Sequence, residues 1–246
     1  MRVIFNGELC EKSDLLPGDW LPGSGIFETL RAENFETFAL HRHYCRASEA
    51  AEFQLPSEVE IEAAVKELLH SESFPVSRLR ICFGKSGDWL ITNHQYQDPK
   101  AAKLMIFKDR NQDNELRKKS FPYDRNIALH QDADAAGFDD GILLTKNNEV
   151  AETSFTNIAL EIAGQWVTPP LTAGILNGVM RAIAIDEKVL TVAPITLDQL
   201  QLATRGLLIS SLRIAQEITE IEGRKLAPAT GKSSEIWKLI ESFRGF

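Results

Sequence analysis

The second half of the chain contains the stretch TPPLTAGILNGVMR at residues 168–181. Prolines and two glycines lead directly into an apolar run, whose spacing predicts a helix over residues 177–190. The first amide groups of a helix have no partner within the helix, and the helix dipole places positive potential there. Such a junction can bind a phosphate group. On spacing alone, however, it is more often an ordinary loop that leads into a helix.

Short apolar runs on both sides of this stretch predict a mixture of strands and helices. Asn6 and Gly7 form the favoured two-residue turn between strands at residues 3–5 and 8–10, and Glu33 and Asn34 are the expected turn between strands at 26–31 and 35–40. Further strands are expected at residues 77–84, 102–108, 141–145, 157–162, 166–168, 206–211 and 218–221, with a polar loop over 85–100 that could contain a short hairpin. Helices are expected from His41 to Pro56 and over residues 61–69, 126–136, 197–202 and 233–246.

A polar run at residues 109–116, DRNQDNEL, is the segment that looks most like a linker. It separates two halves of similar size, each with strands and helices. We therefore predict an N-terminal α+β domain over residues 1–108, a linker over 109–117 and a C-terminal α+β domain over 118–246.

The composition excludes several classes of function. The chain has 27 Lys and Arg against 35 Asp and Glu, a net charge of −8, which argues against nucleic-acid binding. No apolar run approaches the length of a membrane span, and the N-terminus becomes polar too early for a signal peptide. Cys10, Cys45 and Cys82 have no spacing typical of disulfides or zinc, and His41 and His43 do not share a helix face. A cytoplasmic protein without a metal site is expected.

Three further features could line a binding site, although each also has an ordinary explanation. Glu152 lies between two predicted strands and is followed by small polar residues, which alone would describe an exposed turn. The basic run at residues 117–119 would usually be a solvated surface. Arg46, on the first predicted helix, could bind an anion or pair with a surface carboxylate.

In this order, the features resemble the pyridoxal-phosphate enzymes of fold type IV, which include branched-chain and D-amino acid aminotransferases and aminodeoxychorismate lyase. Each motif is weak, but their joint occurrence in the family's order is specific, and the resemblance extends from about Ile4 to Glu222. In the first half, residues 23–31 match a Gly-x-Gly-Ile-Phe-Glu-Thr-Leu-Arg strand of the family, and His43 and Arg46 match its His-x-x-Arg helix. In the second half, Lys119 stands about twenty residues before the pair Asp139 and Asp140, as the family's lysine does. Glu152 with Asn157 matches the family's Glu-x-x-x-x-Asn motif, and residues 168–178 match its phosphate turn.

The resemblance implies a D-amino acid aminotransferase-like fold, in which two α+β domains hold the cofactor in the cleft between them. Pyridoxal 5'-phosphate needs an amine, an anion site and an acidic partner for its pyridine nitrogen. The resemblance assigns the Schiff-base amine, which also moves the Cα proton, to Lys119, with Lys118 as its rival. It assigns the phosphate site to Arg46, to the backbone of Val179 and Met180 and to the hydroxyl of Ser211, and it assigns the pyridine partner to Glu152.

Two departures from the family pattern bear on the reaction. Met180 stands where aminotransferases often have threonine, and the lyase branch tolerates methionine there. The usual Asp-Arg-Gly lead-in is replaced by LPGDW at residues 16–20, which leaves the substrate side undefined. Residues 210–213, Ser-Ser-Leu-Arg, look more like the lyase branch. The resemblance thus favours an aminodeoxychorismate lyase, which expels pyruvate and leaves 4-aminobenzoate for folate biosynthesis.

Two alternatives stay open at this point. A branched-chain or D-amino acid aminotransferase would use the same residues. A catalytically silent paralogue would be expected to have lost the lysine or the glutamate, and both are present.

The substrate is expected to be a small amino-acid-like molecule whose carboxylate is bound by an arginine. Arg213 is our first choice, because it follows the serine that the resemblance places beside the phosphate. Arg31 is the second choice, because strand alternation places it on the same face as Phe27. Each could instead only pair with a nearby carboxylate, Glu217 for Arg213 and Glu33 for Arg31. The resemblance also implies a homodimer, in which a first-half loop (residues 15–22 or 85–93) of one subunit closes the other's pocket.

Overall fold

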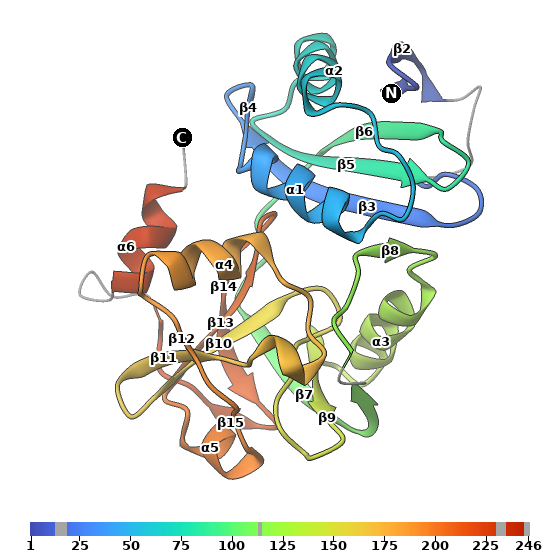
Figure 1. The fold of residues 1–246 in the computed structure, drawn as a ribbon. Helices are drawn as coiled ribbons and strands as arrows, with labels where there is room; N and C mark the ends of the chain where they lie inside the picture. Colours follow the sequence, from blue (N-terminus) through green and yellow to red (C-terminus); the bar gives the residue numbers. More distant parts are fainter. Residues whose placement is uncertain (13–18, 113–114, 230–234, 244–246) are drawn as a thin grey trace. The chain divides into compact units, whose positions relative to one another are not determined.

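A computed structural model describes residues 1–12, 19–112, 115–229 and 235–243 (Figure 1). The chain forms two compact units, each with its own sheet. The first unit contains Met1–Gln97 and Lys118–Tyr123, and the second contains Asp98–Arg117 and the described residues from Asp124 onward. Both units combine helices with strands, so the expected α+β fold class is confirmed. No helix in the described ranges is long and apolar enough to cross a membrane.

The first unit is built on a seven-stranded antiparallel sheet. Its strand order is β2-β1-β6-β5-β3-β4, and β8 also pairs with β3. The expected hairpin at Asn6 and Gly7 is confirmed, since Phe5 pairs with Glu8 across it. The elements are β1 (Arg2–Phe5), β2 (Glu8–Glu11), β3 (Gly25–Glu33), β4 (Glu36–Thr37), α1 (Leu40–Ala50), α2 (Glu58–Ser71), β5 (Val76–Gly84), β6 (Trp89–Gln95) and β8 (Ser120–Phe121).

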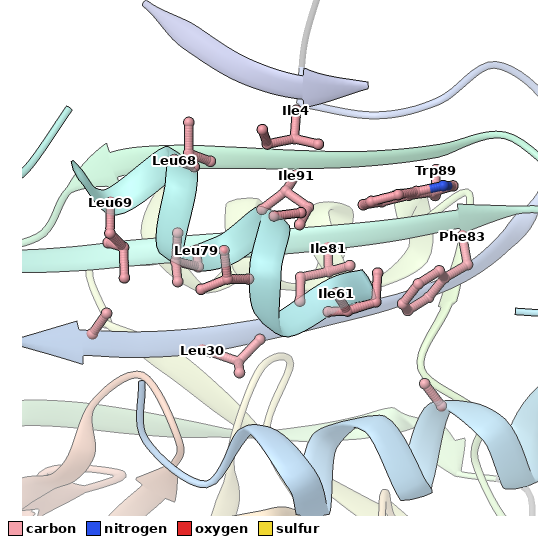
Figure 2. Packing of buried hydrophobic residues seen from close by; sticks show 14 of the residues in the cluster. Ile4, Leu30, Ile61, Leu68, Leu69, Leu79, Ile81, Phe83, Trp89 and Ile91 are labelled. Carbon is pink, nitrogen blue, oxygen red and sulfur yellow. The ribbon is translucent and has the colours of Figure 1, made fainter. Parts of the chain in front are cut away.

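A hydrophobic core lies between this sheet and α2. Leu30, Leu79 and Ile91 come from three neighbouring strands and pack with Ile61 and Leu68 of α2 (Figure 2). All five side chains are fully buried. Burying a side chain of this size stabilises a fold by about 1.5–3 kcal/mol. These five residues therefore determine which face of the sheet packs against α2.

The opposite face of the sheet carries a second cluster. Successive strand residues point to opposite faces, so Phe27 of β3 lies on the face away from Leu30. There it packs with Leu90 of β6 and Phe121 of β8. The alternation therefore places Glu28 on the core side of β3 and Phe27 on the other side.

The second unit is built on an eight-stranded mixed sheet in the order β12-β11-β10-β13-β14-β7-β9, with β15 paired to β14. Strand β7, next to the edge strand β9, is parallel to both β14 and β9, whereas β13 is antiparallel to both β10 and β14. The strands are β7 (Ala102–Gln112), β9 (Asp140–Thr145), β10 (Asn157–Ile162), β11 (Gln165–Thr168), β12 (Thr191–Val192), β13 (Arg205–Ser210), β14 (Ile214–Ile221) and β15 (Arg224–Lys225), and the helices are α3 (Asp124–Ala135), η2 (Leu171–Ala173), α4 (Val179–Asp186), α5 (Leu197–Leu202) and α6 (Glu235–Ser242).

Three expectations for the first unit were wrong. The second strand of the β3–β4 hairpin spans only Glu36–Thr37, because Glu33 pairs with Glu36 and moves the turn to Asn34 and Phe35. The helix expected to reach Pro56 ends at Ala50, and the apolar residues after it pack against the core without continuing the helix. The expected loop at residues 85–100 contains β6, which lies between β1 and β5. Both faces of β6 are covered, so its sequence lacks the polar alternation of an exposed strand.

Other expectations were wrong in the second unit. The run expected as a linker begins inside β7, because strand pairing uses backbone groups that every residue type but proline carries in full, and Asn111 and Gln112 pair with β9. The helix expected over residues 177–190 spans only Val179–Asp186, since Gly178 has an extended backbone and caps it. The strand expected at 218–221 begins four residues earlier, at Ile214. Residues 16–18 of the expected lead-in, and residues 15–18 of the expected loop at 15–22, lie outside the described residues.

Candidate functional site

A buried carboxylate holds together two residues of the His-x-x-Arg motif in the first unit. Glu28 of β3 faces α1, where its Oε2 lies 2.6 Å from His43 Nδ1. Its Oε1 accepts a hydrogen bond of 3.0 Å from Arg46 Nε, and Arg46 Nη2 also contacts Oε2. Burial by itself would raise the pKa of Glu28, but the charge of Arg46 and the hydrogen bonds of Arg46 and His43 outweigh it and lower the pKa to about 2. Glu28 is therefore ionised at neutral pH.

His43 is a neutral imidazole in this arrangement. Its burial lowers its pKa more than the neighbouring Glu28 raises it. Because ionised Glu28 only accepts hydrogen bonds, His43 Nδ1 must carry the proton and donate it. The Nε2 atom is then an acceptor, and it has no hydrogen-bond partner within the described ranges of the chain. Arg46 thus carries an internal ion pair, and its contact with a phosphate stays a prediction.

The structure separates the two candidate lysines, Lys119 and Lys118. Lys119 precedes β8, and its carbonyl oxygen accepts a hydrogen bond of 2.9 Å from the Phe27 amide. Its Nζ lies 4.6 Å from the centre of the Phe27 ring and 5.5 Å from that of Tyr123. Lys118 instead forms an exposed ion pair of 2.7 Å with Glu52. Lys119 is therefore the lysine on the aromatic side of the sheet.

Sequence reasoning missed Arg80, which lies beside the same aromatic ring. Its guanidinium carbon is 4.2 Å from the centre of the Trp20 ring and 5.6 Å from that of Phe27. Burial, and the charge of Arg78, lower the pKa of Arg80. Its Nε is buried and has no hydrogen-bond partner among the residues that the structure describes. A buried cationic nitrogen without a partner is costly, which makes Arg80 a candidate anion-binding group.

The carboxylate of Asp19 is bound by residues other than Arg80. Asp19 Oδ1 accepts from Lys12 Nζ at 2.6 Å and lies 3.0 Å from His94 Nε2, while its Oδ2 accepts from Arg78 at 3.3 Å. The sequence signal that could have revealed Arg80 is the pair Arg78 and Arg80 within an otherwise apolar strand. Strand alternation places both on the face opposite the α2 core.

The two arginines proposed for the substrate carboxylate each have a partner in their own unit. Arg31 forms an ion pair with Glu33, as the alternative interpretation expected, and its side chain is 3% exposed. Arg213 Nη1 donates a hydrogen bond of 2.6 Å to Gln216 Oε1, so its partner is not the expected Glu217. Ser211, just before it, is buried at the turn between β13 and β14.

Glu152 in the second unit is not the exposed turn residue of the ordinary explanation. Only 3% of it is exposed, and both carboxylate oxygens have donors. Oε1 accepts a hydrogen bond of 2.6 Å from Arg117, and Oε2 accepts bonds of 3.1 Å from Asn157 Nδ2 and from the Leu176 amide. Arg117 is itself held by Asn126 Oδ1 at 2.7 Å. The sequence did not indicate Arg117 as the partner of Glu152.

The loop before α4 is tied to Glu152 through Asn157. Besides its bond to Glu152, Asn157 Nδ2 donates a hydrogen bond of 3.0 Å to the Leu176 carbonyl. A Cβ atom at Gly178 would lie only 2.0 Å from Asn157 Oδ1, so glycine is required at this position. Gly178 caps α4, and Val179 and Met180 supply the first amides of that helix. The phosphate turn and the pyridine partner expected from the sequence therefore belong to one hydrogen-bonded assembly.

Arg181 follows this turn but faces inward. Its Nη2 donates a hydrogen bond of 2.7 Å to the Pro169 carbonyl, and its Nε lies 3.3 Å from Thr168 Oγ1. Arg181 thus fixes the two prolines to α4. Within the described ranges, His, Cys, Asp and Glu side chains form no group of three or more that could hold a metal ion.

The sequence of this chain is similar to one protein family and to several known proteins. Residues 25–221 match the family described as amino-transferase class IV. A Thermotoga maritima protein that carries the name branched-chain-amino-acid aminotransferase is 30% identical over 165 residues, which are 63% of this chain and 60% of that protein. A Schizosaccharomyces pombe protein that carries the name aminodeoxychorismate lyase is 28% identical over 168 residues, which are 64% of this chain and 71% of that protein.

The fold is also similar to solved structures. A branched-chain aminotransferase from Thermoproteus uzoniensis, crystallised with norvaline, superimposes with a TM-score of 0.83 at 23% identity. The match covers 99% of this chain and 93% of that structure. The D-amino acid aminotransferase-like fold expected from the motifs is confirmed by this similarity.

Proposed function

Because the chain belongs to the class IV aminotransferase family, whose enzymes depend on pyridoxal phosphate, we propose that it is a lyase that removes pyruvate from aminodeoxychorismate and leaves 4-aminobenzoate. The observation that carries this reaction is the Ser-Ser-Leu-Arg sequence at residues 210–213, which resembles the lyase branch and forms the turn between β13 and β14. The Schizosaccharomyces pombe relative supports the same activity by its name. Family membership makes the protein an enzyme, so the silent alternative is not retained.

A class IV aminotransferase of a branched-chain or D-amino acid is the second candidate. It is favoured by the Thermotoga maritima relative, which carries an aminotransferase name at 30% identity. The residues assigned below would serve either reaction, because the two differ only in the fate of the substrate after its Cα proton has been removed.

The residues present fit pyridoxal phosphate. The second unit offers a helix N-terminus without a side-chain cap, preceded by a glycine that has no room for a Cβ atom. Amides at such a terminus bind phosphate, so the backbone of Val179 and Met180 would hold that group, with the Ser211 hydroxyl and the Arg46 guanidinium. When bound, the cofactor supplies an electron sink for negative charge at the substrate Cα.

Glu152 would hold the proton on the pyridine nitrogen of the cofactor. A carboxylate can do so only if it stays ionised and in place. The Arg117 guanidinium holds one carboxylate oxygen of Glu152, and the Leu176 amide and Asn157 hold the other. Arg117 is in this proposal a positioning residue for Glu152.

Lys119 would bind the cofactor covalently and, once released by the substrate amine, take the proton from Cα. Arg80 joins Arg213 and Arg31 as a candidate for the substrate carboxylate. It is supported by its Nε, which has no hydrogen-bond partner among the described residues, and by the Phe27 ring that it shares with Lys119. An amino-acid substrate carries its carboxylate on the carbon next to the amine, so an arginine near the lysine suits it.

The decisive experiment measures both activities on one preparation. The purified protein should absorb at roughly 410–430 nm, as expected of this cofactor class. It is then incubated with aminodeoxychorismate, with 4-aminobenzoate and pyruvate measured, and separately with a panel of L- and D-amino acids, with keto acids measured. Stoichiometric 4-aminobenzoate and pyruvate support the lyase. If keto acids form from an amino acid and aminodeoxychorismate yields no 4-aminobenzoate, the protein is an aminotransferase and the lyase proposal is wrong.

Replacing each of the three arginines by glutamine, one at a time, tests which of them binds the substrate carboxylate. Arg80→Gln should raise the KM for the true substrate and leave the absorption band intact. Arg213→Gln and Arg31→Gln serve as the comparison, and a raised KM in either of these alone would assign the carboxylate to that residue.

A further inference from the structure

The first unit contains a cavity away from the Phe27 ring and Lys119. Its volume is about 290 Å³, and Ala32, Phe35, Leu69 and Phe74 form much of its wall. Ala32 and Phe27 are five residues apart on β3, which at about 3.4 Å per residue corresponds to ~17 Å. The cavity therefore lies at the end of the strand opposite to the ring of Phe27.

One polar group lines this cavity without a partner. Ser77 of β5 is 1% exposed, and its Oγ has no hydrogen bond to any residue in the described part of the chain. Asn93 of β6 lies on the same face of the sheet, diagonal to Ser77, and its Oδ1 is also buried without a partner there. Buried polar atoms are normally bonded, so the Ser77 hydroxyl in the wall of the cavity has unused hydrogen-bonding capacity.

The turn that carries Phe35 supplies independent evidence. Four described two-residue hairpins have positive φ at both turn positions, and three of them place glycine second: Asn6-Gly7, Ala163-Gly164 and Glu222-Gly223. The fourth, between β3 and β4, has Asn34 and Phe35, with φ of 50° and 67°. A bulky residue is rare in this left-handed region, because its Cβ crowds the backbone.

Phe35 thus occupies a position where glycine would suit the turn better. The residue is 52% exposed, so burial in the core does not explain its presence there. Instead, its ring forms a wall of the cavity and lies 5.2 Å from the ring of His70 on α2. Backbone strain that the core does not explain is typical of ligand-binding positions.

We propose that this cavity is a second binding site, which takes an uncharged aromatic molecule about the size of indole with one hydrogen-bonding group directed at Ser77. The residues that line the cavity carry no charge, so an ion is not the ligand. An engineered apolar cavity of roughly 150 Å³ holds benzene, and the larger volume here suits one ring with a fused ring or a substituent. Phe35 and Phe74 provide aromatic faces for it.

The test uses the enzyme with its cofactor bound and measures probe binding by calorimetry and ligand-observed NMR. Indole should bind with a dissociation constant of about 1 mM or below. 1-Methylindole, which cannot donate a hydrogen bond, should bind about 3- to 10-fold more weakly, as expected for one hydrogen bond. In Ser77→Ala the two probes should bind equally well.

Two further variants alter the shape of the cavity. Ala32→Leu fills it and should abolish indole binding, whereas Ala63→Leu, at an exposed position of α2, should leave binding unchanged. Phe35→Gly keeps the probe test informative if Ala32→Leu fails to fold. Glycine suits the φ of this turn, so the variant should melt no lower than the wild type and yet lose indole binding.

Indole binding that Ser77→Ala and Phe35→Gly both leave unchanged would overturn the proposal, and so would the absence of binding to the wild type. Binding that is displaced by an amino-acid substrate would place the probe in the substrate site and would also overturn it. The proposed reaction is not involved in any of these measurements, so its failure would be recognised separately.

Discussion

Replacing Glu28 by glutamine should destabilise the first unit by about 3 kcal/mol at neutral pH. Glu28 is buried, and its pKa is lowered from 4.5 to about 2 by its two partners against the effect of burial. A tenfold change in an acid constant corresponds to about 1.4 kcal/mol, so the ionised form gains ~3 kcal/mol on folding. Removing one partner of a buried ion pair costs a similar amount, about 3–5 kcal/mol, because the Arg46 charge stays behind.

The sign of the pH dependence follows from the lowered pKa. The contribution of Glu28 is fully present above its unfolded pKa of about 4.5, and it is lost as the pH falls toward 2. The stability difference between the wild type and Glu28→Gln should therefore be largest at pH 6–7 and shrink steadily between pH 5 and pH 2.

Urea unfolding at pH 7, 5 and 3, followed by tryptophan fluorescence, measures this difference. Glu67→Gln, at an exposed position of α2, is the matched control and should change stability by less than about 0.5 kcal/mol at each pH. A Glu28→Gln penalty that is the same at pH 3 as at pH 7 would refute the reasoning, because Glu28 would then not be an ionised partner of Arg46.

Borohydride reduction followed by peptide mapping should place the cofactor label on Lys119, because Lys118 is paired with an exposed carboxylate; a label on Lys118 would reverse the assignment. Glu152→Gln should retain the cofactor but lower kcat by about 10²- to 10³-fold, as for other lost electrostatic contacts in active sites, and an unimpaired variant would show that Glu152 has only a structural role. Arg46→Ala should weaken cofactor affinity more than it lowers kcat at saturating cofactor, since a charged phosphate partner is removed; unchanged affinity in a cofactor titration would leave Arg46 with its Glu28 pair alone. The enzyme should be a homodimer by light scattering, and a fully active monomer would contradict this.

Local features of the fold were predictable from the sequence. The Asn6-Gly7 hairpin, the strand β10 and the helix α5 were predicted within a residue, because turn chemistry and side-chain periodicity act between near neighbours. The motif order also indicated the family, because the spacing of motifs along the chain is visible without any structure. The β6 strand was not predicted, since a strand covered on both faces lacks the polar alternation of an exposed one.

Most contacts within the candidate site could not be predicted from the sequence. The sequence pointed to Glu152, Lys119 and Arg46 as separate candidates, but it did not indicate which neighbour each would contact. The structure places Arg117, 35 residues away, against Glu152, and it directs Arg46 to a carboxylate 18 residues away on another element.

Arg80 illustrates the same limit most clearly. From the sequence it is one of several strand arginines. Only the pairing of β5 with β3 and the packing of Trp20 decide that its Nε is buried beside Phe27, with no hydrogen-bond partner in the described part of the chain. By itself, the sequence determined the residue types, their periodicity and the order of the motifs. Tertiary structure decided burial and charge partners, because these depend on contacts between residues distant in the chain.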